Sequence, residues 1–452
     1  MRRRTFLTTA VAAPVLAVAG GRRAGAQIEV GDGPYGPLAT TADANGILLP
    51  EGFSSRILAT SGEIVAGTEY TWHVFPDGGA TFESDGGGWI YVSNSEAGVG
   101  TSGVGALAFD ERGEIIDAYS ICLGTTRNCA GGPTPWATWL TCEEIEGGKV
   151  LECDPRGEQD PVILPLLGAF IHEAACVDPD GKALYLTEDA PDGRFYRFTP
   201  ESYPDLTTGV LEVAQLDDSG AVSWLPVPDP SAAQTTTRLQ VPESTAFNGG
   251  EGIWYQEGFV WFVTKGDGGV WKLDVAAQTI EPVYKAADGE IVLNGPDNLM
   301  VSATGDVYVC EDAGEDQQLV VITPDGVIAP ILQLTGQSGS ELAGAAFNPA
   351  GDRLYISSQR GGSGGGGVTY EITGPFRQPE PPPTTTAETT VSPTTAAIAS
   401  TRAPASDGAT SDDDGGLSPI VPIGIGGALA AALGYGAYRL RTRRPTTPPP
   451  LE

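Results

Sequence analysis

The chain has 452 residues, of which 58 are Asp or Glu and 25 are Lys or Arg, so its formal net charge is −33. A surface this acidic repels phosphate backbones, which excludes a general nucleic-acid binder. The 62 Gly and 36 Pro residues argue against a helical bundle, whereas 8 Trp, 14 Tyr and 13 Phe residues can build a folded core.

Residues 1–26 are predicted to be an export signal. Three arginines, Arg2 to Arg4, precede a short apolar stretch, and Ala24-Gly25-Ala26 offers a small-residue cleavage site. The Arg-Arg-x-Phe-Leu order resembles a twin-arginine signal, which directs the export of folded proteins. An ordinary secretory signal is the alternative.

The C-terminal end reads as a linker, a membrane span and a tail. Residues 377–416 are rich in Pro, Thr and Ser, which is typical of a disordered linker. Residues 417–438 are uncharged, mostly apolar and long enough to cross a bilayer. The basic tail, residues 439–452, should remain in the cytoplasm. We therefore expect an extracytoplasmic domain anchored to the cell surface by a single C-terminal transmembrane helix.

Between these ends, residues 28–376 alternate short β-prone runs with turns. The runs include residues 89–92, 183–186, 259–263 and 306–309, and turn signals lie at residues 178–181, 323–326 and 348–351. Because no long stretch has a helical period, the pattern predicts an all-β fold.

A repeat of six units runs through this region. Each unit begins at an acidic or thiol residue and reaches a second polar cluster after one strand, a turn and another strand. The pairs are Asp77 with Asn94 and Glu96, Cys129 with Glu143 and Glu144, Glu173 with Glu188 and Asp189, Glu251 with Thr264 and Lys265, Asp297 with Glu311 and Asp312, and Glu341 with Ser357 and Gln359. The starts are 52, 44, 78, 46 and 44 residues apart. Most of these spacings suit a four-stranded blade, which predicts a six-bladed β-propeller with an insertion within residues 200–243 of the long unit.

A propeller would bring the repeated acids together. The innermost strand of each blade lines the axis, so equivalent carboxylates converge and repel one another unless cations hold them. Location in separate surface turns is the alternative for any single acid.

The chain has six cysteines, Cys122, Cys129, Cys142, Cys153, Cys176 and Cys310. An even count in an exported protein suggests disulfides, although folding in the reducing cytoplasm argues against dependence on them. Cys129 differs from the others because it occupies a unit start in a glycine-rich segment. A thiolate among carboxylates favours a transition metal, and oxygen-only clusters suit calcium. With only His73 and His172, a histidine-rich zinc site or a Ser-His-Asp triad is not expected.

Several motifs resemble the bacterial PhoX-type alkaline phosphatases. The most specific is Gly-Thr-Thr-Arg-Asn-Cys-Ala-Gly-Gly-Pro-Thr-Pro-Trp at residues 124–136, with the Cys-Glu-Glu run that ends at Glu144. Others are His172-Glu173-Ala174, Thr187-Glu188-Asp189, Gly249-Gly250-Glu251, Pro296-Asp297-Asn298 and Glu341-Leu342-Ala343-Gly344. In order and spacing they cover nearly the whole predicted domain.

The resemblance implies a six-bladed propeller that binds Fe3+ and Ca2+, leaves the cytoplasm by the twin-arginine route and hydrolyses phosphate monoesters. It implies that Cys129 is a thiolate ligand of iron and that Glu144, Glu173 and Glu251 act with it in catalysis. The remaining metal-ligand candidates are Glu143, Glu188, Asp189, Asp297, Glu311 and Asp312, and their partition between the two metals stays open. Arg194 or Arg197 could clamp phosphate oxygens, with a structural strand role as the alternative for Arg197.

Some positions depart from the family pattern. Ser95 and Ala137 stand where His and Gly are expected, and Ser357-Ser358-Gln359 is atypical. The leading hypothesis is a monomeric, surface-anchored phosphatase that scavenges phosphate from small phosphomonoesters. The alternatives are a non-enzymatic, calcium-stabilised propeller that binds a protein or glycan, and a calcium-dependent lactonase or phosphotriesterase-like propeller.

Overall fold

The structure is a computed structural model, and it describes residues 28–286, 292–312, 314–362 and 364–379. The predicted export signal, most of the linker, the transmembrane span and the basic tail lie outside these residues. Among the described residues, no helix has the length and apolar character needed to cross a bilayer.

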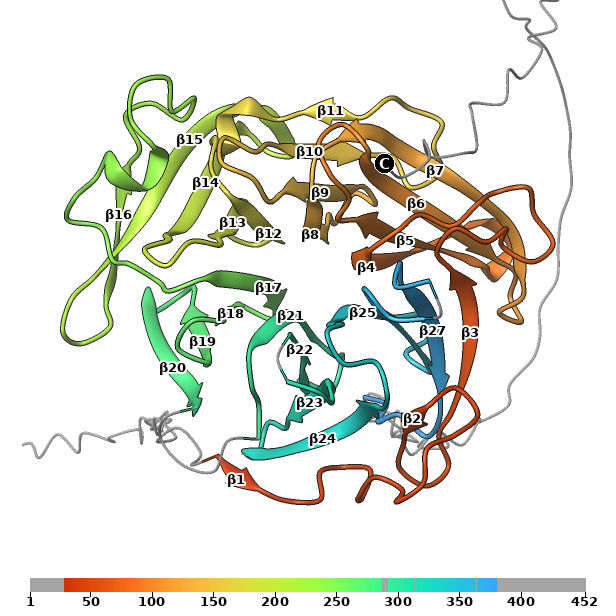
Figure 1. The fold of residues 1–452 in the computed structure, drawn as a ribbon. Helices are drawn as coiled ribbons and strands as arrows, with labels where there is room; N and C mark the ends of the chain where they lie inside the picture. Colours follow the sequence, from red (N-terminus) through yellow and green to blue (C-terminus); the bar gives the residue numbers. More distant parts are fainter. Residues whose placement is uncertain (1–27, 287–291, 313, 363, 380–452) are drawn as a thin grey trace, which may run out of the picture. The chain divides into compact units, whose positions relative to one another are not determined.

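The described chain forms six sheets, or blades, in which neighbouring strands pair antiparallel except for the parallel pair of β1 and β24 (Figure 1). Four blades use consecutive strands only, and blades 5 and 6 also take strands from the start of the described chain. Blade 1 comprises β4 (Pro76–Glu83), β5 (Trp89–Ser95), β6 (Ser102–Phe109) and β7 (Ile115–Thr125). Blade 2 comprises β8 (Asn128–Pro133), β9 (Trp139–Glu143), β10 (Val150–Cys153) and β11 (Val162–Ile163). Blade 3 comprises β12 (His172–Asp178), β13 (Ala183–Glu188), β14 (Phe195–Ser202), β15 (Asp205–Leu216) and β16 (Val222–Pro226).

Blade 4 comprises β17 (Gly250–Gln256), β18 (Phe259–Thr264), β19 (Gly269–Asp274) and β20 (Thr279–Lys285). Blade 5 comprises β21 (Pro296–Val301), β22 (Val307–Glu311), β23 (Gln318–Ile322) and β24 (Val327–Leu334), with β1 (Glu29–Val30) and β2 (Ile47–Leu48) paired to β24. Blade 6 comprises β25 (Leu342–Phe347), β26 (Arg353–Ser358), β27 (Val368–Thr373) and β3 (Ser54–Thr60). Three short 3-10 helices are η1 (Asp85–Gly87), η2 (Pro165–Leu167) and η3 (Thr237–Leu239).

The innermost strands form a closed ring. Each of β4, β8, β12, β17, β21 and β25 contacts the next, and β25 contacts β4. Strand β3, from the start of the described chain, pairs antiparallel with β27 from its end, and Figure 1 shows the two side by side. This pairing covers the outer edge of β27 and joins both ends of the domain in one sheet. The predicted six-bladed propeller is therefore confirmed, as is the insertion, which adds β16 and η3 to blade 3.

Apolar side chains fill the interfaces between the blades. Six buried clusters of the described residues each draw mainly on two neighbouring blades. In the interface of blades 3 and 4, for example, Phe195 stacks on Phe262 with ring centroids 4.5 Å apart. Because blade packing alone orients the innermost strands, this core fixes the residues that face the axis.

All six cysteines are buried and unpaired. Five of them lie in apolar clusters, where a cysteine packs as a small hydrophobic side chain: Cys122, Cys142, Cys153, Cys176 and Cys310. The disulfides that the even count suggested are not formed in this structure.

Candidate metal centre

The six predicted unit starts all lie at one end of the innermost strands. In five blades the unit start is the second residue of its strand, and in blade 6 it directly precedes β25. We call this set the inner ring: Asp77, Cys129, Glu173, Glu251, Asp297 and Glu341. In blades 1 to 5 the strand register shifts at this residue. A bulge leaves its residue out of the ladder and redirects the side chain, so the repeat aims six polar groups toward the axis.

The side chains of the inner ring meet in four overlapping groups, in each of which the candidate ligand atoms lie within 4.8 Å of one another. The groups are Cys129-Glu144-Glu173, Glu173-Glu251-Asp297, Asp297-Asp312-Glu341 and Asp77-Glu96-Glu341. Every member of the inner ring belongs to at least one group. Three further carboxylates, Glu96, Glu144 and Asp312, join from positions just after the second strands.

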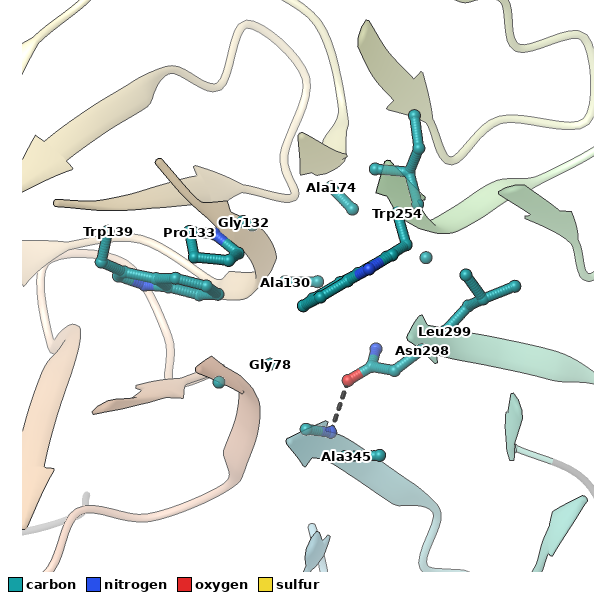
Figure 2. A pocket seen from close by; sticks show the side chains of 15 residues that line it. Gly78, Ala130, Gly132, Pro133, Trp139, Ala174, Trp254, Asn298, Leu299 and Ala345 are labelled. Carbon is teal, nitrogen blue, oxygen red and sulfur yellow. Dashed lines mark hydrogen bonds between the residues drawn. The ribbon is translucent and has the colours of Figure 1, made fainter. Parts of the chain in front are cut away.

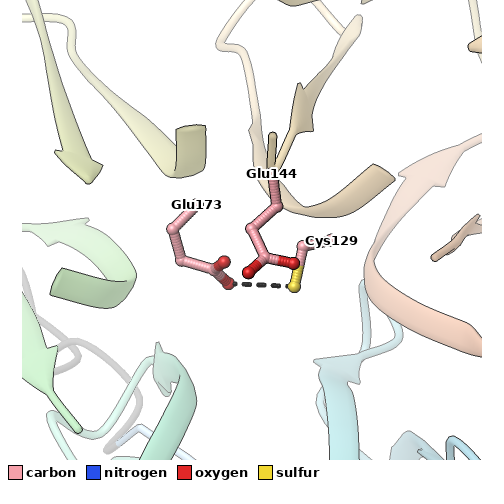
Figure 3. A group of neighbouring side chains, drawn as sticks. All are labelled: Cys129, Glu144 and Glu173. Atoms are coloured by element: carbon pink, nitrogen blue, oxygen red, sulfur yellow. Dashed lines mark hydrogen bonds between the residues drawn. The ribbon is translucent and has the colours of Figure 1, made fainter. Parts of the chain in front are cut away.

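The thiol of Cys129 lies between carboxylates of two other blades. Its Sγ atom is 3.3 Å from Glu173 Oε1 and 3.6 Å from Asp77 Oδ2. Figure 3 shows Glu144 reaching the same point from the end of β9. The second oxygen of Glu173, Oε2, is buried and has no hydrogen-bond partner. Cys129 is therefore the soft member of an otherwise oxygen-only cluster.

Glycines after Cys129 allow the blades to approach this closely. A Cβ atom at Gly131 would overlap the carbonyl oxygen of Leu140, and one at Gly132 would overlap that of Ala175 in blade 3. These contacts confirm that the glycine-rich segment permits close backbone approach.

The buried carboxylates are electrostatically unfavourable without a cation. Burial, followed by the charges of neighbouring ring residues, raises the pKa of Glu173 and of Asp77 well above the usual range. The same causes raise the pKa of Glu341 to about 10. Burial and then the nearby acids also raise the pKa of the Cys129 thiol. In the absence of metal these groups therefore favour their protonated forms.

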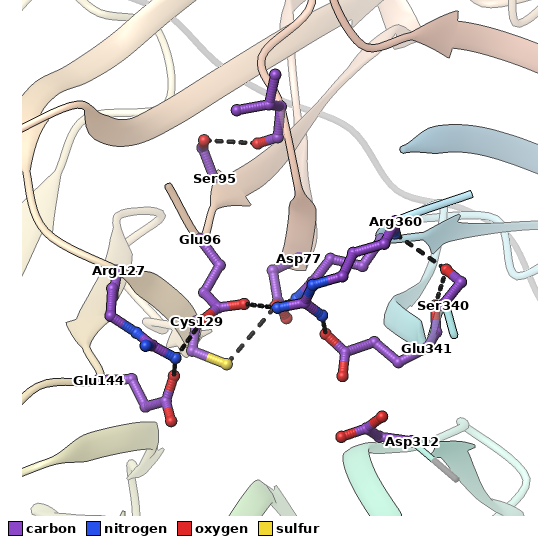
Figure 4. A network of polar contacts seen from close by, with 12 residues as sticks. Asp77, Ser95, Glu96, Arg127, Cys129, Glu144, Asp312, Ser340, Glu341 and Arg360 are labelled. Atoms are coloured by element: carbon purple, nitrogen blue, oxygen red, sulfur yellow. Dashed lines mark hydrogen bonds and ion pairs between the residues drawn. The ribbon is translucent and has the colours of Figure 1, made fainter. Parts of the chain in front are cut away.

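Three basic residues partly neutralise the centre. Lys265 Nζ lies 3.3 Å from Glu251, 3.2 Å from Asp297 and 3.0 Å from Asp312. Arg127 and Arg360 both pair with Glu96, at 2.6 and 2.7 Å, and continue to Glu144 and Glu341 respectively (Figure 4). Their side chains are 46% and 39% exposed, so these two guanidinium groups lie at the accessible rim.

The structure brings most of the sequence-predicted site residues together. Cys129, Glu144, Glu173, Glu251, Asp297 and Asp312 all belong to the four groups. Asp189 lies close enough for its charge to raise the pKa of Glu144 and of Glu251, but it is a member of no group.

Three other predicted ligands have different partners, and we call them the strand-end set: Glu143, Glu188 and Glu311. Glu143 accepts backbone N–H groups of Thr126 and Lys149 at 3.0 and 3.1 Å. Glu311 accepts those of Asn294 and Gln318 at 2.7 and 2.9 Å.

Glu188 accepts hydrogen bonds from the backbone N–H of Arg194 and the hydroxyl of Tyr196, and it forms an ion pair with Arg238. All three residues of the strand-end set therefore tie loops to the second strand of their blades.

Three acids and three bases of the centre are absent from the metal ligands predicted from the sequence. The repeat placed Asp77, Glu96 and Glu341 at unit starts or unit ends, and this phase was the signal that could have assigned them to the metal set. The three bases lie near the same strand ends: Lys265 and Arg360 follow second strands, and Arg127 precedes an innermost strand. Because basic side chains do not bind metal ions, the predicted ligand set does not include them.

Two predicted phosphate clamps are corrected. The guanidinium of Arg194 is buried against Ser244 Oγ, at 2.7 Å, and backbone carbonyls. Arg197 pairs with Glu212 at 2.7 Å and lies over the Trp224 ring, as its structural alternative predicted. Arg197 is therefore used within blade 3, and Arg194, which directly precedes β14, is used to hold the segment that contains Ser244.

The axis is nearly closed beside the inner ring. A cavity of about 30 Å³ is lined by the small residues that follow the ring residues, such as Gly78, Ala130 and Gly252, and by Trp254 (Figure 2). This volume holds about one or two waters and excludes a phosphate ester. The exposed guanidinium groups of Arg127 and Arg360 mark an accessible side of the ring.

The donor set fits bound cations. Oxygen ligands from several carboxylates suit calcium, and a thiolate beside carboxylates suits a transition metal such as iron. The partnerless Glu173 Oε2 and the raised pKa values are both relieved by a cation at the centre.

Comparisons with known proteins agree with this fold. PhoX of Pseudomonas fluorescens, solved in complex with vanadate, a transition state analogue, matches with a TM-score of 0.63 and 17% identity over 75% of this chain and 97% of that chain. A protein of unknown function from Bacteroides thetaiotaomicron matches with a TM-score of 0.47 and 10% identity over 71% and 76% of the two chains. A gluconolactonase of Xanthomonas campestris, XC5397, matches with a TM-score of 0.41 and 14% identity over 76% and 99%. At such identities the first match supports the propeller fold alone.

No curated protein matches the sequence. The model of the family "Alkaline phosphatase PhoX" matches residues 112–292 and 267–362. Together the two matches span residues 112–362, which is more than half of the 452 residues, and they include every member of the inner ring except Asp77. The chain therefore belongs to the PhoX family of alkaline phosphatases.

Proposed function

We propose that this protein is a metal-dependent phosphomonoesterase that acts outside the cytoplasm and releases phosphate from small esters. The observation that carries the proposal is the inner ring itself, in which buried acids and one thiol from six blades converge beside an open rim. Membership of the PhoX family supports the same reaction class.

The metals in this proposal are Fe3+ and Ca2+. The group of Cys129, Glu144 and Glu173 would hold iron, since it alone among the four groups contains a thiol. Calcium would bind carboxylate oxygens of the ring that lie outside the thiol group. When bound, these ions supply positive charge that attracts the phosphate dianion and stabilises the negative charge that develops during hydrolysis.

The residues of the chain position the ester. Arg127 and Arg360 present guanidinium groups at the rim, where planar paired N–H donors suit phosphate oxygens. Both are held in place by Glu96, which lies between them. The small cavity beside the ring has room for about one or two waters.

The location of the enzyme also belongs to the proposal. Sequence composition supports the proposed order of segments. They are an export signal at residues 1–26, the propeller domain at residues 28–376, a linker at residues 377–416, a membrane span at residues 417–438 and a cytoplasmic tail at residues 439–452. In this proposal the propeller domain is exposed on the cell surface, and we propose that it is monomeric. Fractionation of cells that carry the full chain and a chain truncated before residue 417 would test it: only the full chain should sediment with membranes.

The decisive test measures metal and activity together in the full chain. We expect elemental analysis to find iron and calcium, and we expect p-nitrophenyl phosphate hydrolysis to depend on calcium. Cys129→Ala should lose iron and activity, whereas the matched variant Cys176→Ala, at a buried cysteine outside the inner ring, should keep both. Hydrolysis without any bound metal, or unchanged iron in Cys129→Ala, would contradict the proposal.

A further inference from the structure

Blade 4 carries a base where most other blades carry an acid. The residue directly after the second strand is an acid in four blades: Glu96 in blade 1, Glu144 in blade 2, Asp189 in blade 3 and Asp312 in blade 5. In blade 4 the residue that follows β18 is Lys265. The chain has only five lysines, and this one lies beside the inner ring.

The ammonium group of Lys265 lies where a cation would lie. One nitrogen atom is within 3.0–3.3 Å of carboxylate oxygens of Glu251, Asp297 and Asp312, which come from two blades. The contact with Glu251 is an ion pair only, because Glu251 Oε1 accepts no hydrogen bond. Arg127 and Arg360 differ from Lys265, because each pairs with two carboxylates from the exposed rim. Among the described residues, neither arginine forms an ion pair with Asp77 or Glu173.

The backbone holds Lys265 in this position. Its N–H donates to the carbonyl of Gly249 at 2.8 Å, and the next residue, Gly266, donates to Asn248 at 3.0 Å. Both acceptors immediately precede β17, whose second residue is Glu251. The base and its first carboxylate are therefore fixed relative to each other by the same strand pair.

We propose that Lys265 is an internal cation that takes the place of a metal ion between blades 4 and 5. This inference rests on the proposed function in taking the inner ring as a metal centre. An ammonium and a divalent cation at the same three carboxylates would repel each other strongly at such short range. Metal ions then bind on the side of blades 1 to 3, where Cys129, Glu173 and Asp77 have no basic partner of their own.

The test counts metal ions in the full chain after removal of the lysine charge. Wild type, Lys265→Met and the control Lys272→Met, which alters an ion pair with Glu281 in the same blade, are stripped with a chelator and titrated with Ca2+ by calorimetry. We expect Lys265→Met to bind one more Ca2+ per chain than wild type, and Lys272→Met to match wild type. Equal stoichiometry in wild type and Lys265→Met would overturn the inference while leaving the proposed function intact. Absence of metal binding in every variant would overturn both.

A second measurement uses the wild-type chain and does not depend on how the variant folds. Reductive methylation followed by mass spectrometry reports which lysine amines are free. We expect Lys265 to stay unmodified in both metal-free and Ca2+-loaded protein, because its carboxylate partners are kept. Methylation of Lys265 only after loading would show that metal displaces it, and would overturn the inference.

Discussion

The inner ring and the strand-end set are neighbouring carboxylates with opposite surroundings. Glu188 pairs across the strands with His172, the residue that precedes Glu173. Glu311 pairs in the same way with Pro296, the residue that precedes Asp297. The strand-end carboxylates receive backbone N–H groups from loops, whereas Glu173 keeps an oxygen with no partner. A buried carboxylate that backbone N–H groups or an arginine already satisfy needs no metal ion, so acidity at the right phase of the repeat does not by itself identify a ligand.

The largest effect is expected for Glu173→Gln, which tests whether an inner-ring carboxylate binds metal. The change removes a charge shared by two candidate metal groups, so we expect iron and calcium content to fall and kcat/KM for p-nitrophenyl phosphate to drop by about 100-fold or more. In metal-free protein the same variant should unfold at a higher temperature, because a neutral amide removes the cost of protonating the buried Glu173 carboxyl on folding. Elemental analysis, a steady-state assay and thermal unfolding measure the three effects. Normal metal content in Glu173→Gln would show that the ring is not the metal centre.

The second prediction concerns the pH dependence of the metal-free protein. Burial is the main cause that raises the pKa of Glu144 to about 8 and that of Glu341 to about 10, from 4.5 in the unfolded chain. The folded state therefore binds more protons than the unfolded state above pH 4.5, and its stability must fall as the pH rises toward these values. Each such group contributes a slope of about 1.4 kcal/mol per pH unit.

Urea unfolding of chelator-treated protein at pH 5 to 8 would measure this loss. Added metal should reverse the trend, because cations bind the deprotonated carboxylates more tightly as the pH rises. Metal-free protein that grows more stable from pH 5 to pH 8 would contradict the assigned burial of the ring.

The strand-end set should affect stability without affecting metal. In Glu311→Gln the carboxylate that accepts the N–H groups of Asn294 and Gln318 becomes an amide with only one acceptor oxygen. We expect the free energy of unfolding to fall by about 1–2 kcal/mol while metal content stays at the wild-type level. Glu281→Gln, at a side chain that is 59% exposed, is the control and should change stability by less than about 0.5 kcal/mol. Loss of metal in Glu311→Gln would return this residue to the ligand set.

The sequence predicts the blades and the ring better than it predicts the roles of individual acids. Strand alternation, turn residues and unit spacing are local, and they place Asp77, Cys129 and Glu341 at equivalent positions. The partners of Glu188 and Arg194 depend on how a loop closes over the end of a blade, which no local pattern encodes. Lys265 breaks the acidic pattern, and only the folded ring reveals the three carboxylates around it.

The smallest expected effect lies in the turn that joins the strands of Cys129 and Glu143. Ala137 has a φ of 62°, in the left-handed region, at the position where the family pattern predicts glycine. An alanine pays a steric penalty there that glycine avoids, so Ala137→Gly should raise the free energy of unfolding by up to about 1 kcal/mol and leave metal content unchanged. Ala183→Gly, in β13 with ordinary backbone geometry, should instead lower it by about 0.5–1 kcal/mol. Urea unfolding of both variants separates relief of backbone strain from a general effect of glycine, and destabilisation by Ala137→Gly would show that the methyl group of Ala137 contributes packing that outweighs the strain.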